Sequence, residues 1–238
     1  MDALCGVFAA QFYSVGSADQ NKNLIMKIKV CGMTQVEQIN ALNDLNADFV
    51  GFIFYEKSPR YVLNHLSENE IKNINRNFKN VGVFVNASAE EIFLKIKNCR
   101  LDVVQLHGDE SPEFVKIISS EKPVIKAFGV KDAEDLEQKI KDYSDVADYF
   151  MFDTSSKNYG GTGKKFDWNI LQNSFISKPY FLSGGIDEND IEAIHSLTKT
   201  DAGKHLFSLD INSRFEVSPG VKNIPKTEKF LQEIKNLV

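Results

Sequence analysis

The feature that most constrains the fold is an unbroken alternation of short apolar runs and segments of helical spacing, beginning at Lys27. Runs rich in β-branched and aromatic residues indicate strands, and strands that alternate with helices indicate βα units in a parallel sheet. Eight runs are predicted as strands: 27–31, 48–54, 80–85, 102–107, 123–129, 149–154, 179–183 and 206–211. Helices are predicted in segments such as 34–46, 88–99, 111–118, 132–143, 166–174, 187–197 and 224–238, several of which open with a Ser, Thr or Asp suited to an N-cap.

This count predicts an α/β protein built as a single (β/α)8 barrel. Eight βα units in roughly 210 residues match the usual size of such a barrel, whereas a doubly wound sheet has fewer strands and a switch point. We expect the barrel to span residues 26–238 and residues 1–25 to be an extension that is disordered or not native to it. Because the carboxyl ends of all eight strands meet on one face, functional side chains are expected where strands end.

Composition and charge exclude several classes of function. The net charge is −5, and no dense group of Lys and Arg alternates with aromatic residues, so no nucleic-acid partner is expected. No apolar run has the length of a membrane span, and the first 25 residues lack the basic start of a signal peptide. Cys5, Cys31 and Cys99 form no CxxC pair and the histidines do not cluster, which predicts a cytoplasmic protein without a metal centre.

Two strand ends carry residues suited to acid–base chemistry. Cys31 ends the first strand, and its thiol would need a positive neighbour such as Lys29 to form the reactive thiolate. Asp153 ends the sixth strand, where apolar neighbours would disfavour the charged carboxylate and suit a general acid. A buried apolar role for Cys31 and a helix-capping role for Asp153 are the alternatives. Placed on opposite sides of a substrate, the two groups could move protons between two of its atoms.

Three further strand ends carry polar candidates. Arg60, after the second strand, could grip a carboxylate with two hydrogen bonds or be a solvated surface charge. His107 ends the fourth strand, and Gln105 on the same face could fix its tautomer, although a structural role for the histidine is the alternative. Asp210 ends the eighth strand, where it could bind substrate or order its own loop.

Glycines gather in the loops that follow the last strands. Gly161 and Gly163 follow the sixth strand, Gly184 and Gly185 follow the seventh, and Ser213 follows the eighth. Backbone N–H groups in these loops form the common phosphate site of the fold, so the grouping predicts a phosphate cradle. Each glycine pair alone could be an ordinary turn, and neither standard nucleotide-binding glycine motif is present.

An ordered set of motifs resembles the phosphoribosylanthranilate isomerase family from about Lys27 to the C-terminus: KVCGMT, VGFIFYEKSPRY, VGVFVN, VVQLHGDE, VIKAFGV, FDTSSKNYGGTGKKFDW, LSGGI and DINSRFEVSPG. The resemblance implies a cofactor-free Amadori rearrangement of a phosphorylated aminosugar in tryptophan biosynthesis, by a monomer or a homodimer. It also implies that Cys31 is the general base and Asp153 the general acid.

The same resemblance implies roles for the other candidates. Arg60 matches a residue that contacts the anthranilate carboxylate, and His107 and Asp210 match supporting active-site positions. The phosphate-binding segments match Gly161, Gly163, Gly184, Gly185 and Ser213. One departure is Arg214, which occupies a position where family members often carry glycine. Two alternatives remain open: another phosphosugar isomerase or synthase on the same barrel, and a non-catalytic phosphosugar sensor.

Overall fold

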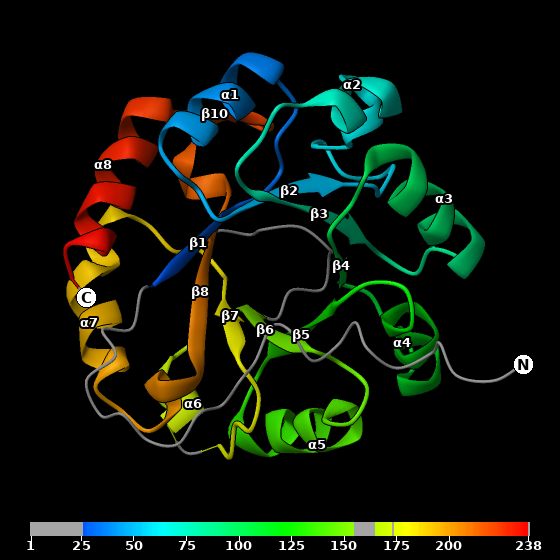
Figure 1. Ribbon diagram of the computed structural model, residues 1–238. Coiled ribbons are helices and arrows are strands. Elements are labelled where there is room, and N and C mark those ends of the chain that lie inside the picture. Colours follow the sequence, from blue (N-terminus) through cyan, green and yellow to red (C-terminus); the bar gives the residue numbers. More distant parts are fainter. Residues whose placement is uncertain (1–25, 155–164, 173, 238) are drawn as a thin grey trace, which may run out of the picture.

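The computed structural model describes residues 26–154, 165–172 and 174–237. Eight parallel strands close into a barrel in sequence order, with helices on the outside (Figure 1). The strands are β1 (Lys27–Val30), β2 (Phe49–Ile53), β3 (Lys79–Phe84), β4 (Val103–Leu106), β5 (Val124–Val130), β6 (Tyr149–Thr154), β7 (Tyr180–Leu182) and β8 (Leu206–Ile211). The predicted (β/α)8, or TIM, barrel is therefore confirmed, and each strand lies within one residue of its predicted limits.

The outer layer consists of helices that follow the strands (Figure 1). They are α1 (Val36–Asp44), α2 (Glu68–Asn73), α3 (Ala89–Cys99), α4 (Pro112–Ser119), α5 (Ala133–Tyr143), α6 (Asn169–Gln172), α7 (Ile191–Thr198) and α8 (Ile224–Lys235). Short 3-10 turns are η1 (Val62–Asn64), η2 (Glu188–Asp190), η3 (Ala202–His205) and η4 (Ser213–Phe215). Within the described residues, no helix is long and apolar enough to cross a membrane.

Local sequence signals explain most helix starts. Ser88, Ser111 and Asp132 each accept a hydrogen bond from a backbone N–H in the first turn of the helix that follows, as predicted for N-caps. The prediction was wrong for Thr34, because its hydroxyl donates to the Gly220 carbonyl oxygen, 2.6 Å away, and does not cap α1. The helix predicted over 166–174 is shorter, because Phe166 and Trp168 precede α6 and pack on the core.

Two apolar clusters hold the barrel together. The larger one fills the space between the strands and the helices, and the smaller one fills the barrel interior. The interior cluster comes mainly from the amino-terminal parts of the strands: Phe49, Val81, Val103, Ile125, Ala127, Met151 and Phe181. Side chains alternate along a strand, so the same interior face carries polar residues nearer the carboxyl ends. The packed interior therefore forms the floor of a polar mouth.

A register shift in β8 decides which of its side chains face inward. Tyr180 of β7 pairs with Leu206, but Phe181 pairs with Ser208, so β8 contains one extra residue at this point. Such a bulge places two successive residues on nearly the same side of a strand. Phe207 accordingly packs against Phe181, with ring centroids 5.5 Å apart, while Asp210 also faces the interior.

Aspartates at the starts of three strands join neighbouring βα units. Asp48 accepts a hydrogen bond from the Ile28 N–H at 2.9 Å, and Asp102 and Asp148 do the same for the N–H groups of Asn80 and Val124 at 2.8 Å. These bonds satisfy backbone donors at the amino end of the barrel, where an unpaired donor would be costly.

We predict that Asp48→Ala lowers the free energy of unfolding by about 1–3 kcal/mol, because the Ile28 N–H loses its acceptor. Urea denaturation at neutral pH measures the change. The control is Asp44→Ala, which removes an exposed carboxylate at the end of α1. Equal stability of the two variants would contradict the role given to Asp48.

Candidate active site

Cys31 lies directly after β1, where the chain turns sharply into the barrel mouth. Its N–H donates to the Ile211 carbonyl oxygen at 2.9 Å, which continues the ladder between β1 and β8. Gly32 then adopts a φ of +74°, and a Cβ at this position would lie 2.7 Å from Arg60 Cδ and 2.8 Å from Asn212 Oδ1. Glycine is therefore required both for the turn and for the close approach of the loops after β2 and β8.

A buried ion pair lies beside the thiol. Lys29 faces the interior from β1 and donates to Asp210 Oδ1 at 2.7 Å, and Ser183 after β7 donates to the other carboxylate oxygen at 3.2 Å. Burial raises the pKa of the Cys31 thiol, Lys29 and Lys222 lower it, and Asp210 raises it, with a net rise. The expected cationic neighbour is thus present, but in this state it does not outweigh burial, and Cys31 is mainly a thiol.

Asp153 is linked to His107 and Gln105 across the mouth. Gln105 Nε2 lies 3.1 Å from His107 Nδ1, and His107 Nε2 lies 3.3 Å from Asp153 Oδ2. With the amide as donor, Nδ1 accepts and Nε2 carries the proton toward the carboxylate, which is the tautomer control expected of Gln105. The other oxygen of Asp153 accepts from the Thr154 N–H at 2.7 Å, so the side chain also caps its own loop.

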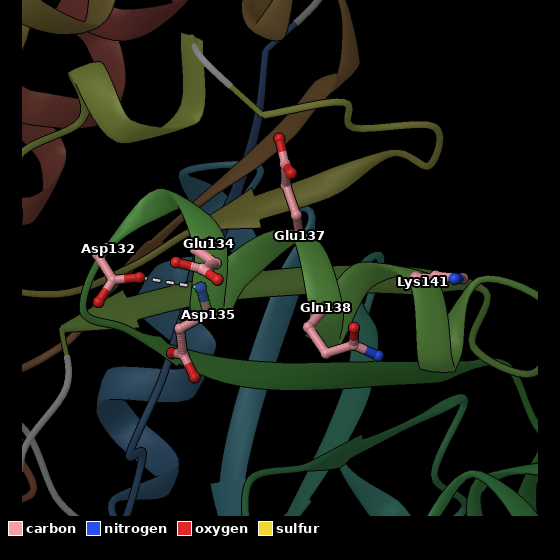
Figure 2. Close-up of a pocket in the computed structure, with 6 residues that line it drawn as sticks. All are labelled: Asp132, Glu134, Asp135, Glu137, Gln138 and Lys141. Atoms are coloured by element: carbon pink, nitrogen blue, oxygen red, sulfur yellow. Dashed lines mark hydrogen bonds between the residues drawn. The ribbon is translucent and has the colours of Figure 1, made fainter.

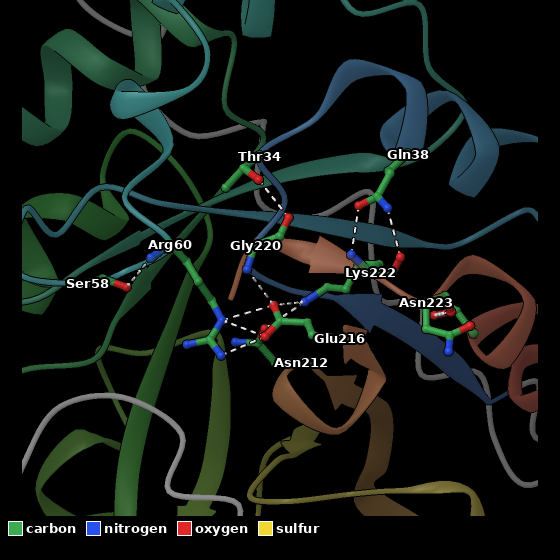
Figure 3. A network of polar contacts seen from close by, with 10 residues as sticks. Thr34, Gln38, Ser58, Arg60, Asn212, Glu216, Gly220, Lys222 and Asn223 are labelled. Atoms are coloured by element: carbon green, nitrogen blue, oxygen red, sulfur yellow. Dashed lines mark hydrogen bonds and ion pairs between the residues drawn. The ribbon is translucent and has the colours of Figure 1, made fainter. Parts of the chain in front are cut away.

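Arg60 is held by a carboxylate of the protein itself. Arg60 Nε lies 2.9 and 3.0 Å from the two carboxylate oxygens of Glu216, and Arg60 Nη2 lies 2.6 Å from Oε2. Figure 3 shows Glu216 between Arg60 and Lys222, whose Nζ donates to Glu216 Oε1 at 2.6 Å. Burial would raise the pKa of Glu216, but hydrogen bonds from Arg60 and the charge of Lys222 lower it overall. Arg60 is buried and ordered, and so is not a solvated surface charge.

A hairpin after β8 supplies this network. It consists of β9 (Glu216–Ser218) and β10 (Val221–Lys222), and it lies outside the barrel sheet. Gln38 of α1 binds the backbone of Lys222 on both sides, accepting from its N–H and donating to its carbonyl oxygen at 2.8 Å each (Figure 3). Together with the bond from Thr34 to Gly220, these contacts fix the hairpin against the loop that carries Cys31.

The predicted phosphate loops are partly described. Gly184 and Gly185 follow β7, and Ser213 begins η4 after β8, so all three lie at the mouth. Gly184 has a φ of +93°, and a Cβ there would lie 2.5 Å from Thr154 Oγ1 and 2.9 Å from Asp153 Oδ1. The loop after β7 therefore packs tightly beside the candidate acid. The remaining two predicted residues, Gly161 and Gly163, lie outside the described residues.

Comparisons with known proteins agree with this geometry. The family model for N-(5'-phosphoribosyl)anthranilate isomerase matches residues 28–233. The N-(5'-phosphoribosyl)anthranilate isomerase of Parabacteroides distasonis is 41% identical over 211 residues, covering 88% of this chain and 93% of that protein. The Thermotoga maritima phosphoribosylanthranilate isomerase structure has a TM-score of 0.73 at 32% identity, covering 89% of this chain and 99% of that one.

The chain belongs to the N-(5'-phosphoribosyl)anthranilate isomerase family. Another solved structure of this family, with a TM-score of 0.72 and 29% identity over 89% of this chain and 99% of that one, holds reduced 1-(O-carboxyphenylamino)-1-deoxyribulose 5-phosphate. Among the described residues of this family member, no group of three or more His, Cys, Asp or Glu side chains is placed to hold a metal ion.

Sequence reasoning missed a third buried lysine–carboxylate pair in this isomerase-family barrel. Lys126 faces outward from β5 and donates to Glu110 Oε2 at 2.8 Å. Glu110 also accepts from the N–H groups of Asn86 and Gly108, so it fixes the loop that follows His107. The motif VVQLHGDE contains Glu110, but no local signal connects it with a lysine sixteen residues later in the chain.

A surface hollow along α5 is not part of this mouth (Figure 2). Acidic side chains dominate its lining, which consists of Asp132, Glu134, Asp135, Glu137, Gln138 and Lys141. Several of these groups serve the helix itself, since Asp132 caps it and Asp135 pairs with Lys139. This stretch is therefore a solvated helix surface.

We predict that Glu216→Gln lowers the free energy of unfolding at pH 7 by about 1.5–3 kcal/mol, because charged hydrogen bonds to Arg60 and Lys222 are lost. A lowered carboxylate pKa stabilises the fold above the ordinary glutamate value of about 4.3 and stops doing so as Glu216 is protonated. The difference from the wild type should therefore shrink below about pH 4.3. Urea titrations across pH test this, with exposed Glu121→Gln as control; a difference independent of pH would contradict it.

Proposed function

We propose that the chain isomerises N-(5'-phosphoribosyl)anthranilate to 1-(2-carboxyphenylamino)-1-deoxyribulose 5-phosphate, an aldose–ketose step of tryptophan biosynthesis. Membership of the isomerase family supports the reaction, and so does the family structure that holds the reduced product. The observation that carries the proposal is the placement of Cys31 and Asp153 at the carboxyl ends of β1 and β6, on one face of a closed barrel.

In this proposal Asp153 is the general acid. It protonates the furanose ring oxygen, and the C1–O bond breaks to give an open-chain Schiff base. His107 donates toward Asp153 Oδ2 and is itself oriented by Gln105, so the carboxyl is held in one direction. A positioned acid of this kind contributes about 10²–10⁴-fold to the rate.

Cys31 is the general base of the second step. Its thiolate removes the proton from the second carbon of the sugar, and the electrons of that C–H bond neutralise the iminium nitrogen to give an enolamine. The enolamine then tautomerises to the ketone, which needs no external oxidant or cofactor. The thiol is only 4% exposed, so the base acts in a pocket from which water is largely excluded.

The two ends of the substrate are assigned to opposite sides of the mouth. Arg60 contacts the anthranilate carboxylate, and within the described residues its hydrogen bonds to Glu216 come from Nε and Nη2, which leaves Nη1 for the substrate. The loops after β7 and β8 bind the phosphate through Gly184, Gly185 and Ser213, joined by Gly161 and Gly163 from the loop after β6. Asp210 acts indirectly, by holding Lys29 beside the base.

We propose a cytoplasmic enzyme that acts as a monomer or a homodimer, with residues 26–238 as its catalytic domain. The family model covers 28–233, which supports this boundary. A family enzyme from Thermotoga maritima is described as dimeric, which supports considering the second state. No nucleic-acid or membrane partner forms part of the proposal.

We predict that Cys31→Ser and Asp153→Asn each lower turnover by at least about 10²-fold while leaving the barrel folded. The assay follows the decay of phosphoribosylanthranilate fluorescence. The substrate is formed in place from anthranilate and phosphoribosyl pyrophosphate, and no metal or nucleotide is added for the isomerisation itself. Cys99→Ser and the exposed Asp145→Asn are matched controls. Substrate binding without turnover by the wild type would favour a phosphosugar sensor, and full activity of either variant would remove that residue from the mechanism.

A further inference from the structure

Two lysines in the part of the mouth that holds Cys31 are fully buried. The side chains of Lys29 and Lys222 are each 0% exposed. Lysine is almost never buried without a partner, because taking an ammonium group out of water is costly. Each lysine has one carboxylate partner, which is Asp210 for Lys29 and Glu216 for Lys222.

Lys29 shares one small space with the thiol. A Cβ at Gly51 of β2 would lie 2.8 Å from Cys31 Sγ and 3.2 Å from Lys29 Nζ, so the missing side chain of Gly51 leaves room for both groups. Lys29 Nζ lies next to Cys31 Sγ while it makes its 2.7 Å contact with Asp210. The ammonium group of Lys29 therefore lies between the carboxylate of Asp210 and the thiol of Cys31, which can ionise.

Lys222 approaches the loop that carries Cys31 from outside the barrel sheet, because its partner Asn212 Oδ1 lies 2.8 Å from the position of a Cβ at Gly32, the residue after the thiol. Its ammonium group donates to Asn212 Oδ1 at 2.7 Å and to Glu216 Oε1 at 2.6 Å. Its backbone is clamped by Gln38, so the hairpin has little freedom to withdraw it. A lysine ammonium has three donors, and the contacts with Asn212 and Glu216 use two of them.

While Cys31 is a thiol, the charged groups of this cluster carry an excess of one positive charge. Lys29, Lys222 and Arg60 carry three positive charges, whereas Asp210 and Glu216 carry two negative charges. A thiolate at Cys31 would supply the third. Since a net charge in a buried site is unfavourable, the excess positive charge partly offsets the burial that keeps Cys31 a thiol.

We propose that Lys29 and Lys222 are positioning residues that together hold the thiolate of Cys31, with the β9–β10 hairpin serving to deliver the second of them. Lys29 lies next to the thiol, and Lys222 lies beside the loop that carries it. The catalytic consequence rests on the proposed role of Cys31 as general base, but the effect on the thiol does not.

The ionisation of the groups around Cys31 agrees with this arrangement. Burial is the largest influence on the pKa of Cys31 and raises it, and Lys29 and Lys222 are the groups that lower it, against Asp210. Burial also lowers the pKa of Lys222 overall, while Glu216 and, to a smaller extent, an ionised Cys31 act to raise it. Thiolate and ammonium therefore stabilise each other, as coupled groups must.

The test measures the pH dependence of Cys31 alkylation by iodoacetamide in the full chain, with Cys5→Ala and Cys99→Ala leaving one thiol. Lys222→Met should move the midpoint to higher pH by about one unit or more, which is about a tenfold loss of thiolate at neutral pH. Glu216 keeps Arg60 as its partner, so this variant leaves no unpaired buried carboxylate. Lys126→Met is the matched control. It also removes a buried lysine that is paired with a carboxylate, but this lysine lies on the outward face of β5, away from the barrel interior.

Restoring the charge with Lys222→Arg should return the midpoint toward the wild-type value, and the limb of the kcat/KM profile that reports thiol ionisation should move with it. Lys29→Met with Asp210→Asn tests the first lysine without leaving its partner unpaired. Unchanged midpoints in the Lys222 and Lys29 variants, or an equal shift in the Lys126 control, would overturn the proposal. A shifted midpoint with an unshifted kcat/KM profile would support the lysine roles and count against Cys31 as the base.

Discussion

The parallel ladder between β1 and β8 is the constraint on which the rest of the molecule depends. It closes the barrel and pairs Lys29 with Asp210 in register, so the two ends of a long sequence meet at one row of the sheet. Closure removes both sheet edges and fixes the side chains of the first and last strands relative to each other. The thiol after β1 and the loop after β8 therefore share one site.

Buried charge is the second organising principle of the mouth. Two groups of charges are buried there: Lys29 with Asp210, and Glu216 with Lys222 and Arg60. Buried ion pairs are stable only when their hydrogen-bond geometry is good. Each pair joins segments far apart in the chain, so each also holds a loop. The cluster consequently both fastens the loops of the mouth and sets the electrostatic environment of Cys31.

Strand endings predicted much of the candidate site because parallel barrels collect all carboxyl ends on one face. Cys31, His107, Asp153 and Asp210 were found this way, and Gln105 was matched with His107 by strand parity. Strict alternation of side chains along β8 would place Phe207 and Asp210 on opposite faces. The bulge in β8 adds one residue between them, so both face the barrel interior. The partner of Arg60 was also beyond prediction, because Glu216 lies 156 residues away.

The sequence by itself determined the eight strands, their limits to within one residue and the residues at their carboxyl ends, since strand periodicity is a local property of the chain. Only the tertiary structure decided which charges meet. Thr34 binds a hairpin and does not cap its helix, and Lys222 enters the mouth from a two-residue strand that no periodicity reveals. These contacts depend on how the closed barrel places distant loops, and that placement is a property of the whole fold.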